Sequence, residues 1–350
     1  MDKAYESISY AGAGVDIDNA DDFKRSIAGA VSAREFAHCK PLNKIGAFAS
    51  LLEIGLGKYR EPVFVLKSEE PGSKQVLSID NDRPEWIARD LINHLVNDII
   101  VMGATPCAVL DTVICGKIEK GVLLRLINAM SEACADNGCI LIGGETSEQP
   151  GVLPVGRYIL QAGVLGVAEK SEIIDGCNIT PGDEVIALAS NGLHTNGYSL
   201  VRKLMETKPE IQDEKNFLDC ILRPHMSYFK AVNTMLDNHR GAIHGMAHIT
   251  GGGIHDNLIR ILPSDDIRAV VDLSLIKAPP IFGLIKRYAG IGDAEMLRTF
   301  NSGVGMAVVA DGAKTDEIIV SLADCGFDAY RIGRVERGPR DVEFINKVHW

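Results

Sequence analysis

The chain has 350 residues, of which 46% are apolar and 24% are charged, and its formal net charge is −11 at pH 7. This composition is typical of a globular protein and excludes a disordered or fibrous chain, while a length above about 250–300 residues favours two domains over one. The acidic balance argues against a protein that binds nucleic acid or an anionic membrane, because contact with phosphate groups needs a basic surface.

The first half of the sequence predicts an arm followed by alternating strands and helices. Residues 1–60 are polar and only weakly periodic, and we treat them as an N-terminal arm. Apolar patterns then predict strands at 63–66, 109–115, 139–142 and 158–167, with helices at 84–102 and 120–136 between them. This alternation is typical of the α/β or α+β class.

A change of character near residue 170 divides the sequence in two. The turn residues Pro181-Gly182-Asp183 come just before a new strand. From there the pattern predicts strands at 184–189, 244–249, 267–272 and 304–310, and helices from about residue 199 and at 226–238, 254–262 and 315–324. We therefore expect one domain at 61–170 and a second, α/β domain at 171–350.

The compartment is suggested by features that the sequence lacks. No apolar run reaches the ~18–20 residues of a membrane helix, and the N-terminus does not have the basic-then-apolar layout of a signal peptide. The eight cysteines include no Cys-x-x-Cys pair, which disfavours a zinc ribbon or a thioredoxin motif. We expect a cytoplasmic protein that contacts no membrane.

The predicted helix at 84–102 carries its polar side chains in one stripe. The stripe consists of Asp90, His94, Asn97 and Asp98. Two carboxylates, an amide and an imidazole on one face could hold Mg²⁺, which prefers oxygen ligands. The alternative is a solvated outer face, which is the usual reason for such a stripe on a surface helix.

Three glycine-bearing loops follow predicted strands. They are Gly143-Gly144-Glu145-Thr146, Gly192-Leu193-His194-Thr195-Asn196-Gly197 and His248-Ile249-Thr250-Gly251-Gly252-Gly253. Glycines let a ligand approach the backbone, and the helix N-termini after the last two loops favour anions. His194 could contact a phosphate or move a proton. The alternatives are a tight turn with a solvated glutamate, a capped loop and a flexible hinge.

The usual nucleotide and zinc motifs are missing. No Walker loop is present, and no glycine pair has the third glycine of a Rossmann turn. His244, His248 and His255 are close in sequence, but their segment has a strand pattern and no glutamate follows the first histidine as in His-Glu-x-x-His. A zinc site among these three is therefore disfavoured, and a bound nucleotide would need another architecture.

Further motifs accompany the three loops in a fixed order. They are Tyr10-Ala11-Gly12-Ala13-Gly14-Val15-Asp16-Ile17, Val96-Asn97-Asp98, Gly103-Ala104-Thr105-Pro106 and Arg298-Thr299-Phe300-Asn301-Ser302-Gly303-Val304-Gly305-Met306. Together with the loops, they resemble the phosphoribosylformylglycinamidine cyclo-ligase family, also called the aminoimidazole ribonucleotide synthetases. The resemblance covers nearly the whole chain, and the joint occurrence is specific although each motif alone is weak.

The resemblance implies both a fold and an activity. The family's N-terminal domain pairs its sheet across a homodimer into a β-barrel, its C-terminal domain is α/β, and the active site lies in the cleft between them. ATP, with Mg²⁺, phosphorylates the amide oxygen of formylglycinamidine ribonucleotide. A nitrogen then attacks that carbon and closes the ring of aminoimidazole ribonucleotide, a step of de novo purine biosynthesis.

The resemblance also implies roles for individual residues. The catalytic residues would be His194 and His248. The metal ligands would be Glu69, Asp98 and Glu145. The residues that bind ATP would be Glu69, Ser73, Lys74, Asp90, Asn97, Gly143, Gly144 and Thr146, and those that hold the substrate phosphate would be Thr195, Asn196, Gly251, Gly252 and Gly253.

The stretch 69–74 departs from the family pattern. The family's first nucleotide loop reads Asp-Gly-Val-Gly-Thr-Lys, whereas this chain has Glu69-Glu70-Pro71-Gly72-Ser73-Lys74. Pro71 removes a backbone N–H, and Glu70 adds a negative charge beside the expected triphosphate. Two hypotheses follow: a cyclo-ligase, or a divergent paralogue. The paralogue would be either a related ATP-dependent enzyme for another phosphorylated substrate or a non-catalytic, ligand-binding homodimer.

Overall fold

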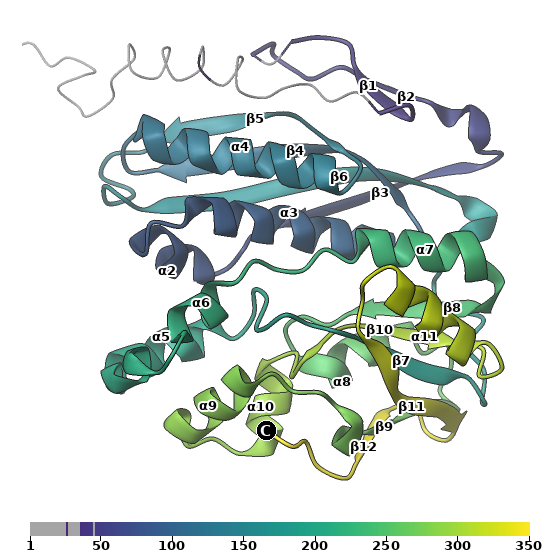
Figure 1. Ribbon diagram of the computed structural model, residues 1–350. Coiled ribbons are helices and arrows are strands. Elements are labelled where there is room, and N and C mark those ends of the chain that lie inside the picture. Colours follow the sequence, from purple (N-terminus) through teal and green to yellow (C-terminus); the bar gives the residue numbers. More distant parts are fainter. Residues whose placement is uncertain (1–25, 27–35, 45) are drawn as a thin grey trace, which may run out of the picture.

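Two helix-covered β-sheets make up the body of the protein (Figure 1). The computed structural model describes residue 26, residues 36–44 and residues 46–350. Most of the expected N-terminal arm, including the motif at 10–17, lies outside the described residues. In the described part of the arm, β1 (Cys39–Pro41) and β2 (Leu52–Ile54) pair in an antiparallel ribbon.

The N-terminal sheet has the strand order β3-β6-β4-β5. Its strands are β3 (Pro62–Glu69), β4 (Thr105–Cys115), β5 (Ile140–Glu148) and β6 (Tyr158–Glu169). The parallel pair β4–β5 is connected by α4 (Lys120–Asp136), which packs beside α3 (Pro84–Ile100), and the other strand pairs are antiparallel. The short helix α2 (Lys74–Asp80) precedes α3.

The C-terminal sheet has the strand order β12-β9-β11-β7-β10-β8. Its strands are β7 (Glu184–Ala189), β8 (Ile243–His248), β9 (Ile267–Asp272), β10 (Val304–Ala310), β11 (Ala329–Arg337) and β12 (Val342–Ile345). Its helices are α5 (Tyr198–Thr207), α6 (Phe217–Leu222), α7 (Phe229–His239), α8 (Gly253–Leu258), α9 (Pro280–Ala289), α10 (Asp293–Thr299) and α11 (Thr315–Asp324). Short 3-10 turns, η1 to η6, cover Leu56–Lys58, Lys170–Glu172, Pro209–Asp213, Arg240–Ala242, Ile259–Ile261 and Leu273–Leu275.

Helix α3 lies between the two sheets (Figure 1). Pro84 begins it, at a position where the missing N–H costs nothing. Leu91 and Leu95 are fully buried in a core cluster that also contains residues of α7 and β10. The polar stripe does not face water, because Asn97 is buried and donates a hydrogen bond to the carbonyl of Met226. The solvated-face alternative for this stripe is therefore wrong.

One face of the N-terminal sheet is covered only in part by the described residues, where the β1–β2 ribbon packs with Ala108 and Ile142. Along β3 exposure alternates, with Val63 and Val65 turned toward α3 and Phe64 and Leu66 turned away. Phe64 is 53% exposed and Leu66 is 75% exposed. The consecutive apolar residues at 63–66 predicted cover on both faces, and the described residues provide it on one.

Two sequence expectations concern the chain's surroundings. All eight cysteines are free. None of the helices in the described ranges has the length and apolar character needed to cross a membrane.

Candidate active site

A cavity of about 570 Å³ opens where the C-terminal end of β3 and helix α3 meet the loops that follow β7 and β8. Cavities of about 300–1,000 Å³ are typical of small-molecule sites. Its polar lining includes Lys67, Glu69, His94, Asp98, Asn196, His248, Thr250, Gly251, Asn257 and Arg260. Basic, acidic and imidazole groups therefore converge on one space between the two sheets.

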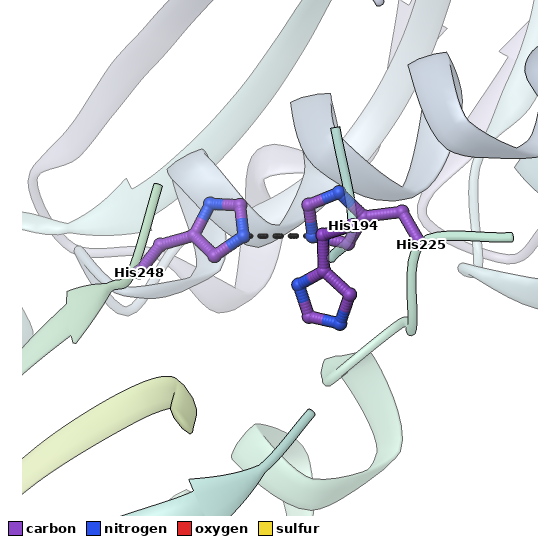
Figure 2. Close-up of side chains that lie close together, drawn as sticks. All are labelled: His194, His225 and His248. Carbon is purple, nitrogen blue, oxygen red and sulfur yellow. Dashed lines mark hydrogen bonds between the residues drawn. The ribbon is translucent and has the colours of Figure 1, made fainter. Parts of the chain in front are cut away.

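Four buried histidines lie beside this cavity and come from separate parts of the chain. His94 belongs to α3, His194 to the loop after β7, His225 to the segment before α7 and His248 to the end of β8. Figure 2 shows His225 and His248 joined through their Nε2 atoms, which are 2.9 Å apart, with His194 beside them. The rings of His194 and His225 are stacked with centroids 3.9 Å apart.

A continuous series of hydrogen bonds links three of these rings, those of His248, His225 and His94, to Asp98. His248 Nδ1 lies 2.7 Å from Asp98 Oδ1. Thr195 Oγ1 lies 3.0 Å from His94 Nδ1 and 3.4 Å from His225 Nδ1. An ionised carboxylate only accepts, so His248 Nδ1 carries its proton in this arrangement and His225 Nε2 donates to His248 Nε2. The rings are thereby held in fixed tautomers.

Burial and neighbouring charges set the protonation of the cluster. Burial, followed by the nearby His248, lowers the pKa of His94 to about 4. Burial also lowers the pKa values of His194 and His225. Burial alone would raise the pKa of Asp98, but the hydrogen bond from His248 and the charge of Lys67 among its neighbours hold that pKa well below its usual range. His94, His194 and His225 are thus neutral imidazoles near an ionised carboxylate.

The cavity collects only part of the predicted site. Glu69, Asp98, His248, Asn196 and Gly251 all line it, as the resemblance implied. Thr195 lies behind the lining, where its hydroxyl contacts two histidines. His194 is also behind the lining, and its ring is only 1% exposed with neither nitrogen hydrogen-bonded within the described residues.

Lys74 and Asp90 form a buried ion pair. Both are fully buried, with Lys74 Nζ 2.8 Å from Asp90 Oδ2, and the ammonium also donates to the carbonyls of His194 and Arg223. Asn97 likewise binds main-chain groups before α7. The polar atoms of these three side chains face protein in this structure, and the ATP contacts expected of them stay a prediction. Ser73 precedes α2 without a capping bond and does not line the cavity.

The β5 loop lies on a different part of the sheet. Gly144 pairs with Asp111 on the face turned toward the helices, because a Cβ there would lie 2.1 Å from Asp111 Oδ1. Glu145 pairs with Thr112 and points to the opposite, uncovered face, with Gly143 on that same face. The expected metal set of Glu69, Asp98 and Glu145 is therefore not assembled within one chain. Thr146 is also remote from the cavity lining.

The three consecutive glycines have different reasons to be glycine. Gly252 and Gly253 have φ angles of +89° and +64°, and a Cβ would lie 2.5 Å from Asp256 Cβ in the first case and 1.8 Å from the carbonyl oxygen of Leu297 in the second. These two are required by the backbone and by packing. Only Gly251 lines the cavity with room for a Cβ, 3.4 Å from Asn196 Oδ1. Of the three glycines in the predicted phosphate-binding loop, only Gly251 lines the cavity.

Three residues were missed from the sequence: Lys67 and Arg260, which line the cavity, and His225, which lies behind its wall. His225 follows Arg223-Pro224, directly before a segment that was assigned to a helix at 226–238, and no motif marked it. Lys67 ends up inside because β3 extends to Glu69, beyond the predicted strand. Arg260 lies in η5, within the predicted helix at 254–262, and only its place after the glycine loop could have marked it.

A larger cavity of about 930 Å³ lies elsewhere, beside α9 and the C-terminal Trp350. It is lined by residues such as Glu214 and Arg287 and contains none of the glycine-bearing loops. Size alone does not make it the reaction site, because the groups able to move protons or hold phosphate gather in the smaller cavity.

The donors of the smaller cavity fit a divalent cation. Glu69 and Asp98 supply carboxylate oxygens, and the ammonium of Lys67 already lies 3.1 Å from an oxygen of each. Glu70 is exposed and does not line the cavity, so the extra charge expected beside a triphosphate is turned away from it.

Two family models and curated relatives match this chain over most of its length. Residues 62–168 match the family model for the N-terminal domain of AIR synthase related proteins, and residues 180–346 match that for the C-terminal domain. Phosphoribosylformylglycinamidine cyclo-ligase of Burkholderia pseudomallei (strain 1710b) is 39% identical over 342 residues, which are 97% of this chain and 95% of that protein.

Two solved structures share the fold at low sequence identity. Thiamine-monophosphate kinase from Stenotrophomonas maltophilia K279a has a TM-score of 0.63 at 16% identity, covering 93% of this chain and 96% of its own. The hydrogenase maturation protein HypE in complex with ATP has a TM-score of 0.60 at 17% identity, covering 90% and 83%. With both halves matched by its family models and a relative aligned over nearly its whole length, the chain belongs to the AIR synthase family.

Proposed function

We infer that the protein catalyses the ATP-dependent cyclisation of formylglycinamidine ribonucleotide to aminoimidazole ribonucleotide, a step of purine biosynthesis. The observation that carries this inference is 39% identity to curated cyclo-ligases over 97% of the chain. The convergence of the loops at 192–197 and 248–253 near one cavity supports it.

The proposed reaction does not require the protein to form a covalent bond with either substrate. The amide oxygen of the substrate attacks the γ-phosphorus of ATP, ADP leaves, and a nitrogen of the amidine then attacks the activated carbon and expels phosphate. Positioning the two substrates and neutralising phosphate charge carry the catalysis. We assign the neutralising charges to Lys67 and Arg260, which both line the cavity.

His248 is our candidate for moving the proton. It lies at the cavity wall, and its hydrogen bond to Asp98 orients the ring and stabilises an imidazolium. In this proposal the substrate displaces the N–H of His225 from His248 Nε2, and this nitrogen takes the proton that the attacking nitrogen loses on ring closure. His194 has a supporting role, because it stacks on His225 behind the cavity wall.

Nucleotide and metal complete the proposal. The fold relative HypE was crystallised with ATP, which supports a nucleotide site here. Glu69 and Asp98 would hold the divalent cation, which neutralises negative charge on the transferred phosphoryl group. Asn196 and Gly251 lie where the ribonucleotide phosphate would approach Arg260.

We also propose a homodimer formed through the uncovered face of the N-terminal sheet, with its strands closing into a barrel across the interface. Phe64, Leu66 and Leu110 are 53%, 75% and 52% exposed and point to this face. Contiguous apolar surface of this kind marks interaction sites. Dimerisation would bring Glu145 to the interface. We place the dimer in the cytoplasm.

Genetic complementation tests the proposed activity. Expression of the chain in a purine auxotroph that lacks the cyclo-ligase is expected to restore growth without added purine, and His248→Gln is expected to fail. Growth restored equally by both would remove His248 from the mechanism. Failure of a well-expressed wild-type chain that still binds ATP would favour the non-catalytic or paralogue alternative.

A further inference from the structure

We propose that His94, Asp98 and His248, with Glu69 beside them, form a mixed nitrogen–oxygen site for a divalent transition-metal ion of the Zn²⁺ class. Groups of this composition are met in proteins as ligands of zinc, cobalt, iron and nickel. The inference stands on the side chains alone and does not require the proposed reaction.

The first observation is the spacing of the donor atoms. His94 Nε2 lies 3.7 Å from Glu69 Oε2 and 3.8 Å from Asp98 Oδ2. Two ligands that each lie ~2.1 Å from one ion are about 3.4–3.8 Å apart at ordinary bond angles. One ligand atom from each of His94, Asp98 and His248 can be chosen so that all three lie within 4.8 Å of one another. His248 Nδ1 needs only a small outward shift from Asp98 Oδ1, now 2.7 Å away.

The second observation is the set of bonds behind the ligands. Histidines that bind a metal donate their other ring N–H to an acceptor, which fixes the tautomer. His94 Nδ1 is 3.0 Å from Thr195 Oγ1, so its N–H can donate there while Nε2 faces the carboxylates. His248 Nε2 is 2.9 Å from His225 Nε2, and His225 Nδ1 is 3.4 Å from the same hydroxyl. Both ligand rings are thus held from behind.

Binding at His248 Nδ1 is possible without a net change in protons. The proton on Nδ1 leaves as the metal binds, and Nε2 takes up the one that His225 Nε2 had donated. His225 Nδ1 gains a proton in place of the one released from His248 Nδ1, so the two rings keep two protons between them, and His225 Nδ1 then donates to Thr195 Oγ1. With metal bound, His248 is a ligand, and the proton transfer proposed for it belongs to the metal-free site.

A competing assignment is excluded by ring geometry. His194, His225 and His248 also come within metal-binding distance of one another (Figure 2). However, His194 and His225 stack at an interplanar angle of 19° with centroids 3.9 Å apart. A metal must lie in the plane of each imidazole that binds it, and one ion cannot lie in two stacked planes. By contrast, His94 and His248 meet at 87°.

The ammonium group of Lys67 lies beside the two carboxylates of the proposed site. The ammonium of Lys67 lies 3.1 Å from Glu69 Oε2 and 3.1 Å from Asp98 Oδ2. Lysine and metal therefore compete for the same two carboxylates. This competition predicts that removing the ammonium strengthens metal binding, which a merely damaged protein would not show.

The nitrogen donors set the preference among metals. Mg²⁺ demands near-octahedral oxygen ligation at about 2.0–2.1 Å and rarely binds imidazole, whereas imidazole suits Zn²⁺, Co²⁺ and Fe²⁺. Two neutral imidazoles beside two carboxylates therefore favour a transition metal over Mg²⁺. The open side of the site faces the cavity, where oxygen atoms of a bound phosphate could complete the coordination.

Cobalt provides the direct test. The full-length chain, freed of metal by chelator dialysis, is titrated with Co²⁺ while visible absorption is recorded, and bound Co²⁺ is then displaced by Zn²⁺. We expect one Co²⁺ per chain with ligand-field bands, displacement by equimolar Zn²⁺, and no displacement by excess Mg²⁺. Absence of the bands, or equal displacement by Mg²⁺, would overturn the proposal.

Three variants make the test specific. His94→Gln keeps a hydrogen-bonding side chain and is expected to weaken Co²⁺ binding about tenfold or more. His255→Gln is the matched control, because His255 is an exposed histidine flanked by Asp256 and Asp341, and it should leave the bands unchanged. Lys67→Met should tighten binding. Loss of the bands in His255→Gln, or unchanged affinity in both other variants, would contradict the site whether or not the chain cyclises its substrate.

Discussion

At the scale of single residues, the buried pair Lys74–Asp90 connects four segments of the chain. The ammonium also donates to two carbonyls in the C-terminal half, so one side chain fixes α2, α3 and the loops after β7 and α6. Removing one partner of such a pair leaves an uncompensated buried charge.

Lys74→Met is therefore expected to lower the free energy of unfolding by about 3–5 kcal/mol. The double variant Lys74→Met/Asp90→Leu should recover part of the loss, because no lone charge stays buried. Urea unfolding followed by circular dichroism measures all three proteins. If the double variant is no more stable than Lys74→Met, the pair does not act as a coupled unit.

Asp111 gives the fold a dependence on pH. Its carboxyl is buried among apolar residues of β4, and burial, with some repulsion from Glu145, raises its pKa to about 7. The native state thus binds a proton at pH values where the unfolded carboxyl, with a pKa near 3.9, has lost it.

The unfolding free energy contributed by this group is expected to be complete below about pH 4 and to decline as the pH rises through about 7. A shift of this size corresponds to up to about 4 kcal/mol. Denaturant unfolding at several pH values should show the decline in the wild type and a flatter profile in Asp111→Asn. Parallel profiles would mean that Asp111 does not titrate in this range.

The loop between β8 and α8 shows, at the scale of elements, how neighbouring glycines differ. Gly252 has a φ angle of +89° and no room for a Cβ, whereas Gly251 borders the cavity with its nearest neighbour 3.4 Å away. A left-handed backbone costs a non-glycine residue about 1–2 kcal/mol before any clash.

Gly252→Ala is accordingly expected to lower the melting temperature by several degrees. Gly251→Ala should melt like the wild type but raise the KM for the phosphorylated substrate. Differential scanning calorimetry and steady-state kinetics on the two variants separate these effects. Equal melting temperatures for both would show that the loop relaxes around either methyl group.

The sequence predicted the long elements well, and its errors have physical causes. The helix at 84–102 and the strand at 184–189 have strong periodicity and appear in the structure as α3 and β7. The polar stripe of the helix at 84–102 was expected to face water or a metal ion. Periodicity separates the polar face of a helix from its apolar face, but it does not show which part of the protein covers the polar face. In fact the C-terminal half covers it.

Short or charged elements escaped prediction. Helix α2 begins at Lys74, inside a stretch that was interpreted only as a nucleotide loop. Strand β11 carries three arginines and one glutamate among its nine residues, and this masks the alternation of a strand. His225 was missed for a related reason: it joins the site only because α3 and the segment before α7 pack together, and such contacts between distant segments leave no local pattern.

At the scale of the whole molecule, the N-terminal sheet presents apolar side chains that the described part of the chain leaves exposed, among them Phe64, Leu66 and Leu110. Leu66→Lys, on the uncovered face of the N-terminal sheet, is expected to convert a dimer into a monomer, because a charge would be buried at the interface. Leu275→Lys, at a leucine of η6 that is 48% exposed, is the matched control and should remain dimeric. Sedimentation velocity distinguishes the species. A wild-type monomer at micromolar concentration would contradict the proposed assembly.

The central claim is that this chain activates an amide oxygen with ATP and then closes a ring. The most direct measurement follows ¹⁸O placed in the amide carbonyl of formylglycinamidine ribonucleotide during turnover by the purified protein. We predict that one ¹⁸O appears in inorganic phosphate for each aminoimidazole ribonucleotide and each ADP formed. Product formed with the label released into water, or ATP hydrolysis without ring closure, would contradict the account.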